Sequence, residues 1–163
     1  MRRRIRALEP GAAAAASTVA MMTGAQVTDA AYVCIRRGAL AVAAWCTAGC
    51  SNALRAGDRA TVADTRPGTI NLIVAINQPL GVSAMAEAIQ IATEARVLAV
   101  QQAGIISTRS GLPATGTGTD CMVIAAPIGP RAHPWCGKHT LVGELIARAA
   151  LKSCARAIAR SRL

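Results

Sequence analysis

Aromatic side chains are nearly absent from this chain, and that absence limits the folds that its core can support. Among 163 residues there are two Trp, one Tyr and no Phe, although 53% of the residues are hydrophobic. The apolar content is therefore mostly Ala, Val, Ile and Leu, which fill a core through close approach of backbones rather than through bulky rings. We expect a thin, layered core in one compact domain.

The charge, hydropathy and cysteine patterns narrow the classes of function. The formal net charge is +10, but the excess lies mostly at the two ends of the chain, which weakens a nucleic-acid-binding interpretation. No run approaches the roughly 18–20 apolar residues of a membrane-spanning helix, and we expect a cytoplasmic protein. The six Cys residues form no pair of Cys-x-x-Cys motifs, so we expect reduced, mostly buried thiols and no metal site.

The order of the apolar runs predicts a sheet covered by helices. Short runs bounded by turn residues indicate strands, and longer runs with apolar residues three and four apart indicate helices. Arg37 and Gly38 are expected to turn a hairpin, Ser83 to cap a helix and Gly104 to end it. We predict an α+β fold in which two long helices pack on a mixed sheet of about four strands, the last two of them parallel through a crossover. The expected strands are residues 32–36, 40–47, 69–76 and 121–126, and the expected helices are residues 12–22, 84–102 and 140–159.

Polar residues that fit no periodic face gather in three loops, residues 47–58, 110–120 and 135–140. Loops at one edge of a sheet commonly carry binding and catalytic residues. Within the second loop, residues 115–120 combine two glycines, which let backbone amides approach a ligand, with three hydroxyls and a carboxylate. From composition alone, residues 115–120 are equally well interpreted as a functional loop or as a solvated turn. The run does not match a Walker A loop.

The run that opens the last helix has two interpretations. Helix amides together with Lys138 favour an anion, and His139 can exchange protons near neutral pH. Alternatively, Thr140 caps the helix and His139 is an exposed neighbour.

Ser51 and Asn52 follow a predicted strand. Ser51 lies two residues after Gly49, as in a nucleophile elbow, but Ala53 stands where that pattern has its second glycine. Asn52 either holds a turn or orients a substrate amide.

Five segments carry a joint signal: residues 46–58 (CTAGCSNALRAGD), 68–77 (GTINLIVAIN), 92–96 (ATEAR), 110–120 (SGLPATGTGTD) and 137–147 (GKHTLVGELIA). In this order, over most of residues 22–151, they resemble the adenosylcobinamide amidohydrolase (CbiZ-type) family. We expect one domain over residues 22–163 after a basic, Ala-rich lead over residues 1–21. Family members usually carry a substantial region before the match, so a chain without that region would lack any substrate contacts or edge strand it supplies.

The resemblance implies hydrolysis of the amide that links aminopropanol to the corrin ring of adenosylcobinamide, giving adenosylcobyric acid for cobalamin synthesis. The corrinoid is then the substrate, and no separate cofactor is expected. Acyl transfer to water needs an activated water or nucleophile, an oxyanion stabiliser and a proton for the leaving amine. We expect Asp120 or His139 to act as acid and base, and Lys138 with the amides of residues 116–119 to stabilise the oxyanion. The expected substrate-binding residues are Ser51, Asn52, Asn71, Glu94, Thr115, Gly116, Thr117, Gly118, Thr119, Gly137 and Thr140.

Two other functions stay open on the sequence. A non-catalytic corrinoid-binding domain would keep the ligand loops without turnover. A basic nucleic-acid-binding protein would show steeply salt-dependent affinity that needs the terminal arginines.

Overall fold

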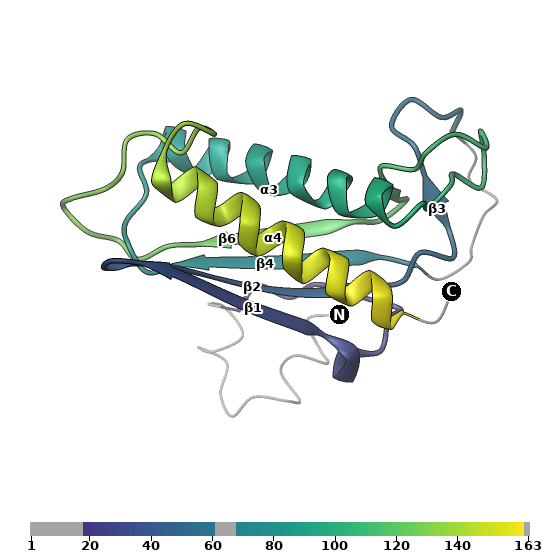
Figure 1. Ribbon diagram of the computed structural model, residues 1–163, viewed down its shortest axis with the longest axis horizontal. Coiled ribbons are helices and arrows are strands. Elements are labelled where there is room, and N and C mark those ends of the chain that lie inside the picture. Colours follow the sequence, from purple (N-terminus) through teal and green to yellow (C-terminus); the bar gives the residue numbers. More distant parts are fainter. Residues whose placement is uncertain (1–17, 61–67, 162–163) are drawn as a thin grey trace.

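A mixed sheet lies under two long helices, as the sequence predicts (Figure 1). The computed structural model describes residues 18–60 and 68–161. The strand order in the main sheet is β1-β2-β4-β6, in which β2 is antiparallel to both β1 and β4, and β6 is parallel to β4. The strands are β1 (Ala31–Arg37), β2 (Leu40–Ala48), β4 (Ile70–Ile76) and β6 (Cys121–Ala125), preceded by the short 3-10 helix η1 (Val27–Asp29).

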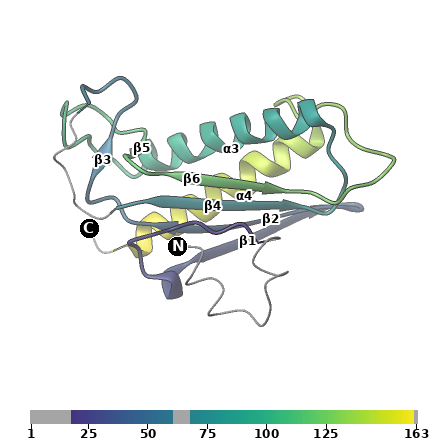
Figure 2. The same cartoon turned by 180° about the vertical axis from the view of Figure 1, so that it is seen from behind.

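Both long helices cover the same face of the sheet and lie side by side (Figures 1 and 2). α3 (Val82–Gln102) crosses over between β4 and the parallel β6, and α4 (Leu141–Arg160) ends the described chain. The core-facing side of α3 carries mostly Ala, which lets the helix approach its neighbours closely. Among the described residues, the buried apolar side chains are Ala, Val, Ile, Leu and Cys, and none is aromatic. The thin aliphatic core is thus confirmed.

Local signals decide where several elements begin and end. Gly38 and Gly104 have φ values of +58° and +68°, so glycine suits the hairpin turn and the end of α3, as predicted. The prediction that Ser83 caps α3 is wrong: the helix begins at Val82, and Gly81 is the capping residue. The amide of Gly81 donates to His133 O at 2.9 Å, which fixes the chain just before the helix and starts it earlier than expected.

Two expectations near loops need correction. Residues 12–17 of the expected first helix lie outside the described residues, and residues 18–22 are not helical. Met22 O accepts a hydrogen bond from Asn71 Nδ2 at 2.8 Å, so a sheet side chain takes the place of a helical partner.

The polar run 107–119 was expected to hold no regular element, yet β5 (Gly116–Thr117) pairs with β3 (Ala53–Leu54) in a two-stranded sheet. Strands of two residues are too short for a periodic pattern.

Two further expectations concern the state of the cysteine thiols and the presence of a membrane-spanning helix. Cys46, Cys50, Cys136 and Cys154 are buried and Cys34 and Cys121 are exposed, and all six are free. In the ranges 18–60 and 68–161, no helix has the length and apolar character needed to cross a membrane.

Candidate functional site

Two of the three predicted polar loops meet at one end of the main sheet. β2 ends there, while β4 and β6 begin there, because β4 is antiparallel to β2 and parallel to β6. This end therefore gathers the loop after β2, the residues before β4 and the loop before β6. We call Gly68, Thr69, Thr117, Thr119 and Asp120 at this end the threonine network.

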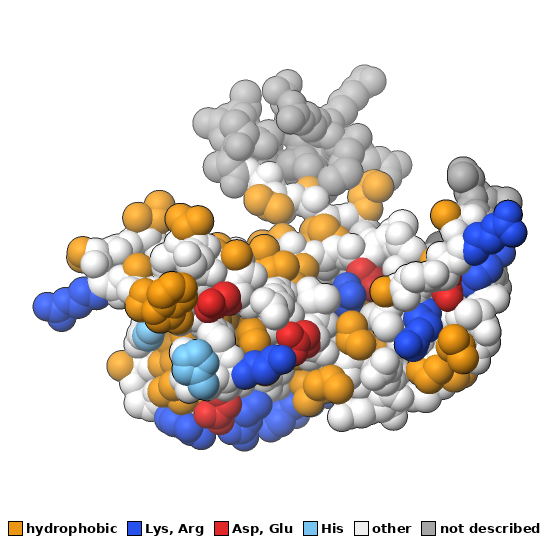
Figure 3. All heavy atoms as spheres, turned by 90° about the horizontal axis from the view of Figure 1, so that it is seen from above, with side chains coloured by type: hydrophobic (Ala, Val, Ile, Leu, Met, Phe, Trp, Pro, Cys, Tyr) orange, Lys and Arg blue, Asp and Glu red, His pale blue; other side chains and the backbone are white. Residues whose placement is uncertain are grey.

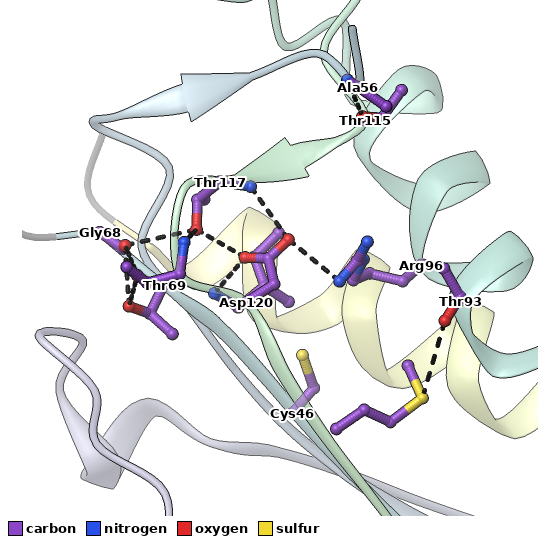
Figure 4. A network of polar contacts seen from close by, with 12 residues as sticks. Cys46, Ala56, Gly68, Thr69, Thr93, Arg96, Thr115, Thr117 and Asp120 are labelled. Carbon is purple, nitrogen blue, oxygen red and sulfur yellow. Dashed lines mark hydrogen bonds and ion pairs between the residues drawn. The ribbon is translucent and has the colours of Figure 1, made fainter. Parts of the chain in front are cut away.

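Asp120 is the centre of the threonine network (Figure 4). Its Oδ1 accepts from Ile70 N at 3.0 Å and from Thr117 Oγ1 at 2.5 Å, and its Oδ2 accepts from Thr117 N at 2.9 Å. Arg96 Nη1 on α3 forms an ion pair with Oδ2 at 3.0 Å, and the side chains of Arg96 and Asp120 are only 15% and 7% exposed. A buried carboxylate needs such compensation. Asp120 thereby ties the start of β4 and the loop before β6 to α3.

The hydroxyls of the network bind the protein itself. Thr119 Oγ1 lies 2.7 Å from Thr69 Oγ1 and 3.0 Å from Gly68 O, and Thr117 Oγ1 lies 3.3 Å from Gly68 O. The amides of Thr117 and Thr119 also donate to side chains of the network, which leaves neither free for a substrate oxyanion.

The two glycines of residues 115–120 differ in whether their surroundings leave room for a side chain. A methyl group at Gly116 would collide with the carboxylate of Asp120, whereas one at Gly118 would meet only Leu54 Cδ1 at 3.5 Å. Gly116 is thus needed so that Asp120 can reach its partners, a packing requirement rather than room for a ligand.

A cavity of about 400 Å³ lies beside this network. Arg96 lines it with Nε buried and without a partner among the described residues. Thr115 Oγ1 accepts from Ala56 N at 2.8 Å and so holds the β3 side of the cavity to the loop before β5. The remaining lining residues are Leu54, Arg55, Ala56, Gly116, Thr117, Gly118 and Asp120. With two arginines and one paired carboxylate, this cavity favours polar or anionic groups.

The third predicted loop lies over the start of α4. Gly143 in the first turn of α4 has no side chain, and a methyl group there would collide with the carbonyls of Cys136 and Gly137. Thr140 Oγ1 accepts from Gly143 N at 3.0 Å, so Thr140 caps the helix, as one of the two interpretations held. We call residues 137–140 the helix-start loop.

The charged residues of the helix-start loop lie at the surface. Lys138 Nζ forms an ion pair with Glu94 Oε2 on α3 at 2.5 Å, with side chains 70% and 41% exposed. The hydrogen bond from Lys138 lowers the pKa of Glu94 below its usual value, and Gln90 adds to this effect. His139 is exposed, stands beside Gly137, and makes no hydrogen bond to a described residue. Lys138 and His139 are therefore both open to an approaching ligand.

The structure does not bring all predicted site residues together. No hydrogen bond or ion pair between described residues joins the threonine network to the helix-start loop. Their link is α3, which carries Arg96 toward Asp120 and Glu94 toward Lys138. Asp120 and His139 consequently make no direct contact.

Ser51 and Asn52 stay at the loop end of the sheet. Ser51 is exposed and lines a cavity of about 500 Å³ with residues 24–26 and 48–50. Asn52 packs against Gly68, and its Oδ1 is buried without a partner among the described residues. Burial raises the pKa of the neighbouring Cys50 to about 11, so Cys50 is a thiol at neutral pH and a poor nucleophile.

Sequence reasoning missed Arg96 as a site residue. It is the only basic residue in α3, and an isolated arginine on an Ala-rich helix near the core implies an acidic partner. That signal was available in the sequence, although the identity of the partner was not.

On the helix side of the molecule, the described basic residues do not form one continuous surface. Over the helix layer, Lys and Arg side chains are interspersed with Asp and Glu (Figure 3). On α4, Arg156 and Arg160 donate to the carbonyls of Tyr32 and Ala30, and Arg148 pairs with Glu144. The arginines at positions 2–6 lie outside the described residues. In the described part of the chain, no three His, Cys, Asp or Glu side chains are grouped to hold a metal ion.

Comparison with known proteins identifies the family. The family model for adenosylcobinamide amidohydrolase (CbiZ) matches residues 2–162. This chain belongs to the adenosylcobinamide amidohydrolase family. It is 34% identical to the adenosylcobinamide amidohydrolase of Halobacterium salinarum over 134 residues, which are 78% of this chain and 52% of that protein.

A second relative is an uncharacterized protein of Methanocaldococcus jannaschii, 42% identical over 92 residues, which are 56% of this chain and 36% of that protein. The matches thus cover about half or less of the length of these relatives. No solved structure matches the chain. The resemblance seen in the five sequence segments is confirmed.

Proposed function

We propose that this chain hydrolyses the amide between aminopropanol and the corrin ring of adenosylcobinamide, giving adenosylcobyric acid in cobinamide salvage. Membership of the adenosylcobinamide amidohydrolase family supports the reaction. The observation that carries the site is the pair Lys138 and His139, a cation and a titratable imidazole, both exposed at the start of α4. Amide hydrolysis requires a proton carrier and an oxyanion stabiliser, and this pair supplies both.

In this proposal His139 removes a proton from the attacking water and later returns one to the departing amine. Lys138, together with the positive end of the α4 dipole, stabilises the oxyanion of the tetrahedral intermediate. Glu94 holds Lys138 in place at 2.5 Å before the substrate arrives. Each of these three groups was selected from the sequence, Glu94 among the substrate-binding residues.

Asp120 has a positioning role in this proposal. Its two oxygens already accept three hydrogen bonds and the ion pair from Arg96. A carboxylate that exchanged protons with the substrate would have to give up part of this network while buried. We therefore assign proton transfer to His139 rather than to Asp120.

The test is incubation of the purified chain with adenosylcobinamide and chromatographic analysis of the products. We expect equal amounts of adenosylcobyric acid and aminopropanol. The His139→Gln variant should lose turnover by about 10²–10⁴-fold, the usual contribution of a general acid or base. Retained turnover in this variant would remove His139 from the mechanism.

A matched control is available in the other histidine. His133 Nε2 bonds Gln78 Oε1 at 2.7 Å and makes no hydrogen bond or ion pair with the described Lys138 or Glu94. His133→Gln should therefore keep turnover close to that of the wild type. Binding of the corrinoid without any product in the wild type would instead favour the non-catalytic corrinoid-binding function.

A further inference from the structure

The face of the sheet opposite the helices carries an apolar row. Side chains alternate along each strand, and the pairing register places Tyr32 on β1 beside Trp45 on β2 and Ile73 on β4. These side chains are 51%, 40% and 37% exposed, and the rings of Tyr32 and Trp45 lie 5.0 Å apart. The two helices lie on the other face (Figure 2). Tyr32, Trp45 and Ile73 thus form an apolar row on this side that the described residues leave partly exposed.

A cavity of about 560 Å³ lies at one end of this row. The sheet forms one wall, and described residues between Val19 and Ala30 form the other. No described Lys, Arg, Asp or Glu lines it, so a charged ligand would lose its hydration without gaining a charge partner. The lining residues are Val19, Met21, Thr23, Val27, Ala30, Trp45, Cys46, Thr47, Asn71 and Ile73.

Two polar atoms in this cavity have no partner. Asn71 is 6% exposed, and its Nδ2 donates to Met22 O at 2.8 Å, but its Oδ1 is buried and unbonded among the described residues. Thr47, the register partner of Asn71 on β2, has a buried Oγ1 that is likewise unbonded. Buried polar atoms are normally paired, and leaving them unpaired destabilises a fold. Two such atoms in one cavity mark a place where a bound polar group would gain hydrogen bonds.

The chemistry of the two atoms defines that ligand group. Asn71 Oδ1 only accepts, so it needs an N–H donor, whereas the Thr47 hydroxyl can donate to a carbonyl. A carboxamide presents an N–H and a carbonyl side by side and carries no charge. A carboxylate has no donor, and an ammonium group has no acceptor.

We propose that this cavity binds a carboxamide arm of a corrinoid whose ring lies against the row of Tyr32, Trp45 and Ile73. The identity of the ligand rests on the proposed function. Corrinoids carry several carboxamide arms around a broad ring, which matches an apolar surface next to a neutral cavity with one acceptor and one donor. The open sheet face lies on the other side of the sheet from α3 and α4, so it is a corrinoid-binding site distinct from the proposed hydrolytic site at His139 and Lys138.

The test measures corrinoid affinity in Thr47→Val by equilibrium dialysis with dicyanocobinamide. Val has the shape of Thr without the hydroxyl, so we expect about tenfold weaker binding, the loss of one hydrogen bond. The thermal midpoint should stay the same or rise, because the change removes a buried polar atom that is unpaired without ligand. A purely structural threonine would show the opposite pattern.

Thr93→Val is the matched control. Thr93 lies on α3 at the opposite face of the sheet, where its hydroxyl donates to the sulfur of Met122 at 4.0 Å. Its replacement should leave the affinity for dicyanocobinamide unchanged.

A second ligand tests the role of the carboxamide. Dicyanocobyrinic acid heptamethyl ester keeps the corrin ring but replaces every amide with an ester, which cannot donate to Asn71 Oδ1. The wild type should bind this ester at least about tenfold more weakly than dicyanocobinamide, and Thr47→Val should reduce that preference. Trp45→Ala should weaken the binding of both ligands, while the preference for the amide ligand persists.

The outcomes separate this inference from the proposed function. If the wild type forms adenosylcobyric acid and Thr47→Val keeps the wild-type affinity, the inference fails and the proposed function stands. If the wild type binds dicyanocobinamide but forms no product, and Thr47→Val weakens binding, the inference stands and the hydrolase function fails. No binding by the wild type overturns both. A change in oligomeric state of Trp45→Ala with unchanged corrinoid affinity would make this face a contact between copies and overturn the inference.

Discussion

The threonine network and the helix-start loop have similar compositions but opposite environments. Both contain glycine, threonine and a charged residue, and both form an ion pair with α3. The pair of Asp120 with Arg96 is buried, with side chains 7% and 15% exposed, whereas Lys138 and Glu94 are 70% and 41% exposed. The first region therefore uses its polar groups to join strands and a helix, and the second keeps its polar groups available to a ligand. The same residue types serve structure or chemistry according to burial.

The largest expected effect is on the buried pair. Asp120→Asn leaves Arg96 with its charge uncompensated inside the protein, and breaking such a pair lowers the free energy of unfolding by about 3–5 kcal/mol. Urea denaturation of the variant and the wild type measures this difference.

Glu94→Gln is the matched change at the ion pair between α3 and the helix-start loop, and it should alter the free energy of unfolding far less, because exposed pairs are weak. Equal losses in the two variants would contradict the division between the regions. Combining Asp120→Asn with Arg96→Met should recover part of the loss, since no unpaired charge then stays buried.

A smaller effect is expected from two glycines in one loop. Gly116→Ala places a methyl group against the carboxylate of Asp120, and we expect a loss of about 1–3 kcal/mol in the free energy of unfolding from this overpacking. Gly118→Ala meets only Leu54 Cδ1 at 3.5 Å and should be neutral or slightly stabilising. Chemical denaturation of the two variants checks the difference. A Gly118→Ala loss as large as that of Gly116→Ala would show that the loop is constrained along its whole length.

The smallest effect concerns pH. The hydrogen bond from Lys138 holds the pKa of Glu94 below its usual 4.5. The pair therefore stabilises the fold above about pH 4.5, and that contribution disappears as the pH falls through the lowered pKa of Glu94. Thermal midpoints of the wild type and Lys138→Gln should differ slightly at neutral pH and converge once the pH falls below the lowered pKa of Glu94. A difference that grows on acidification would contradict this pairing.

Much of the fold follows from patterns that are local in sequence. The apolar run of residues 40–47 after the Arg37-Gly38 turn and the three-and-four spacing in residues 84–102 predicted β2 and α3 with small errors at their ends. The two-residue strands β3 and β5 escaped prediction because their pairing joins residues 53–54 to residues 116–117, and no short pattern encodes a partner so far away. The start of α3 was misplaced for a similar reason, since His133 fixes Gly81 from a distant loop.

The sequence named candidate site residues but not their arrangement. Five segments in family order pointed to Asp120, Lys138 and His139 together. The structure separates Asp120 from His139 and adds Arg96, because α3 lies between the two regions and carries a partner for each.

The sequence by itself determined the α+β class, the hairpin, the two long helices and the family, because these depend on periodicity and on the order of short motifs. Only the tertiary structure decided which groups surround residues 115–120 and 137–140. A threonine or a carboxylate has the same chemistry in both runs, and its role depends on which distant groups surround it and whether water reaches it. Burial brings Asp120 to Arg96 and leaves Lys138 and His139 at the surface. The same dependence on register places Thr47 beside Asn71, a pairing that no pattern within either strand reveals.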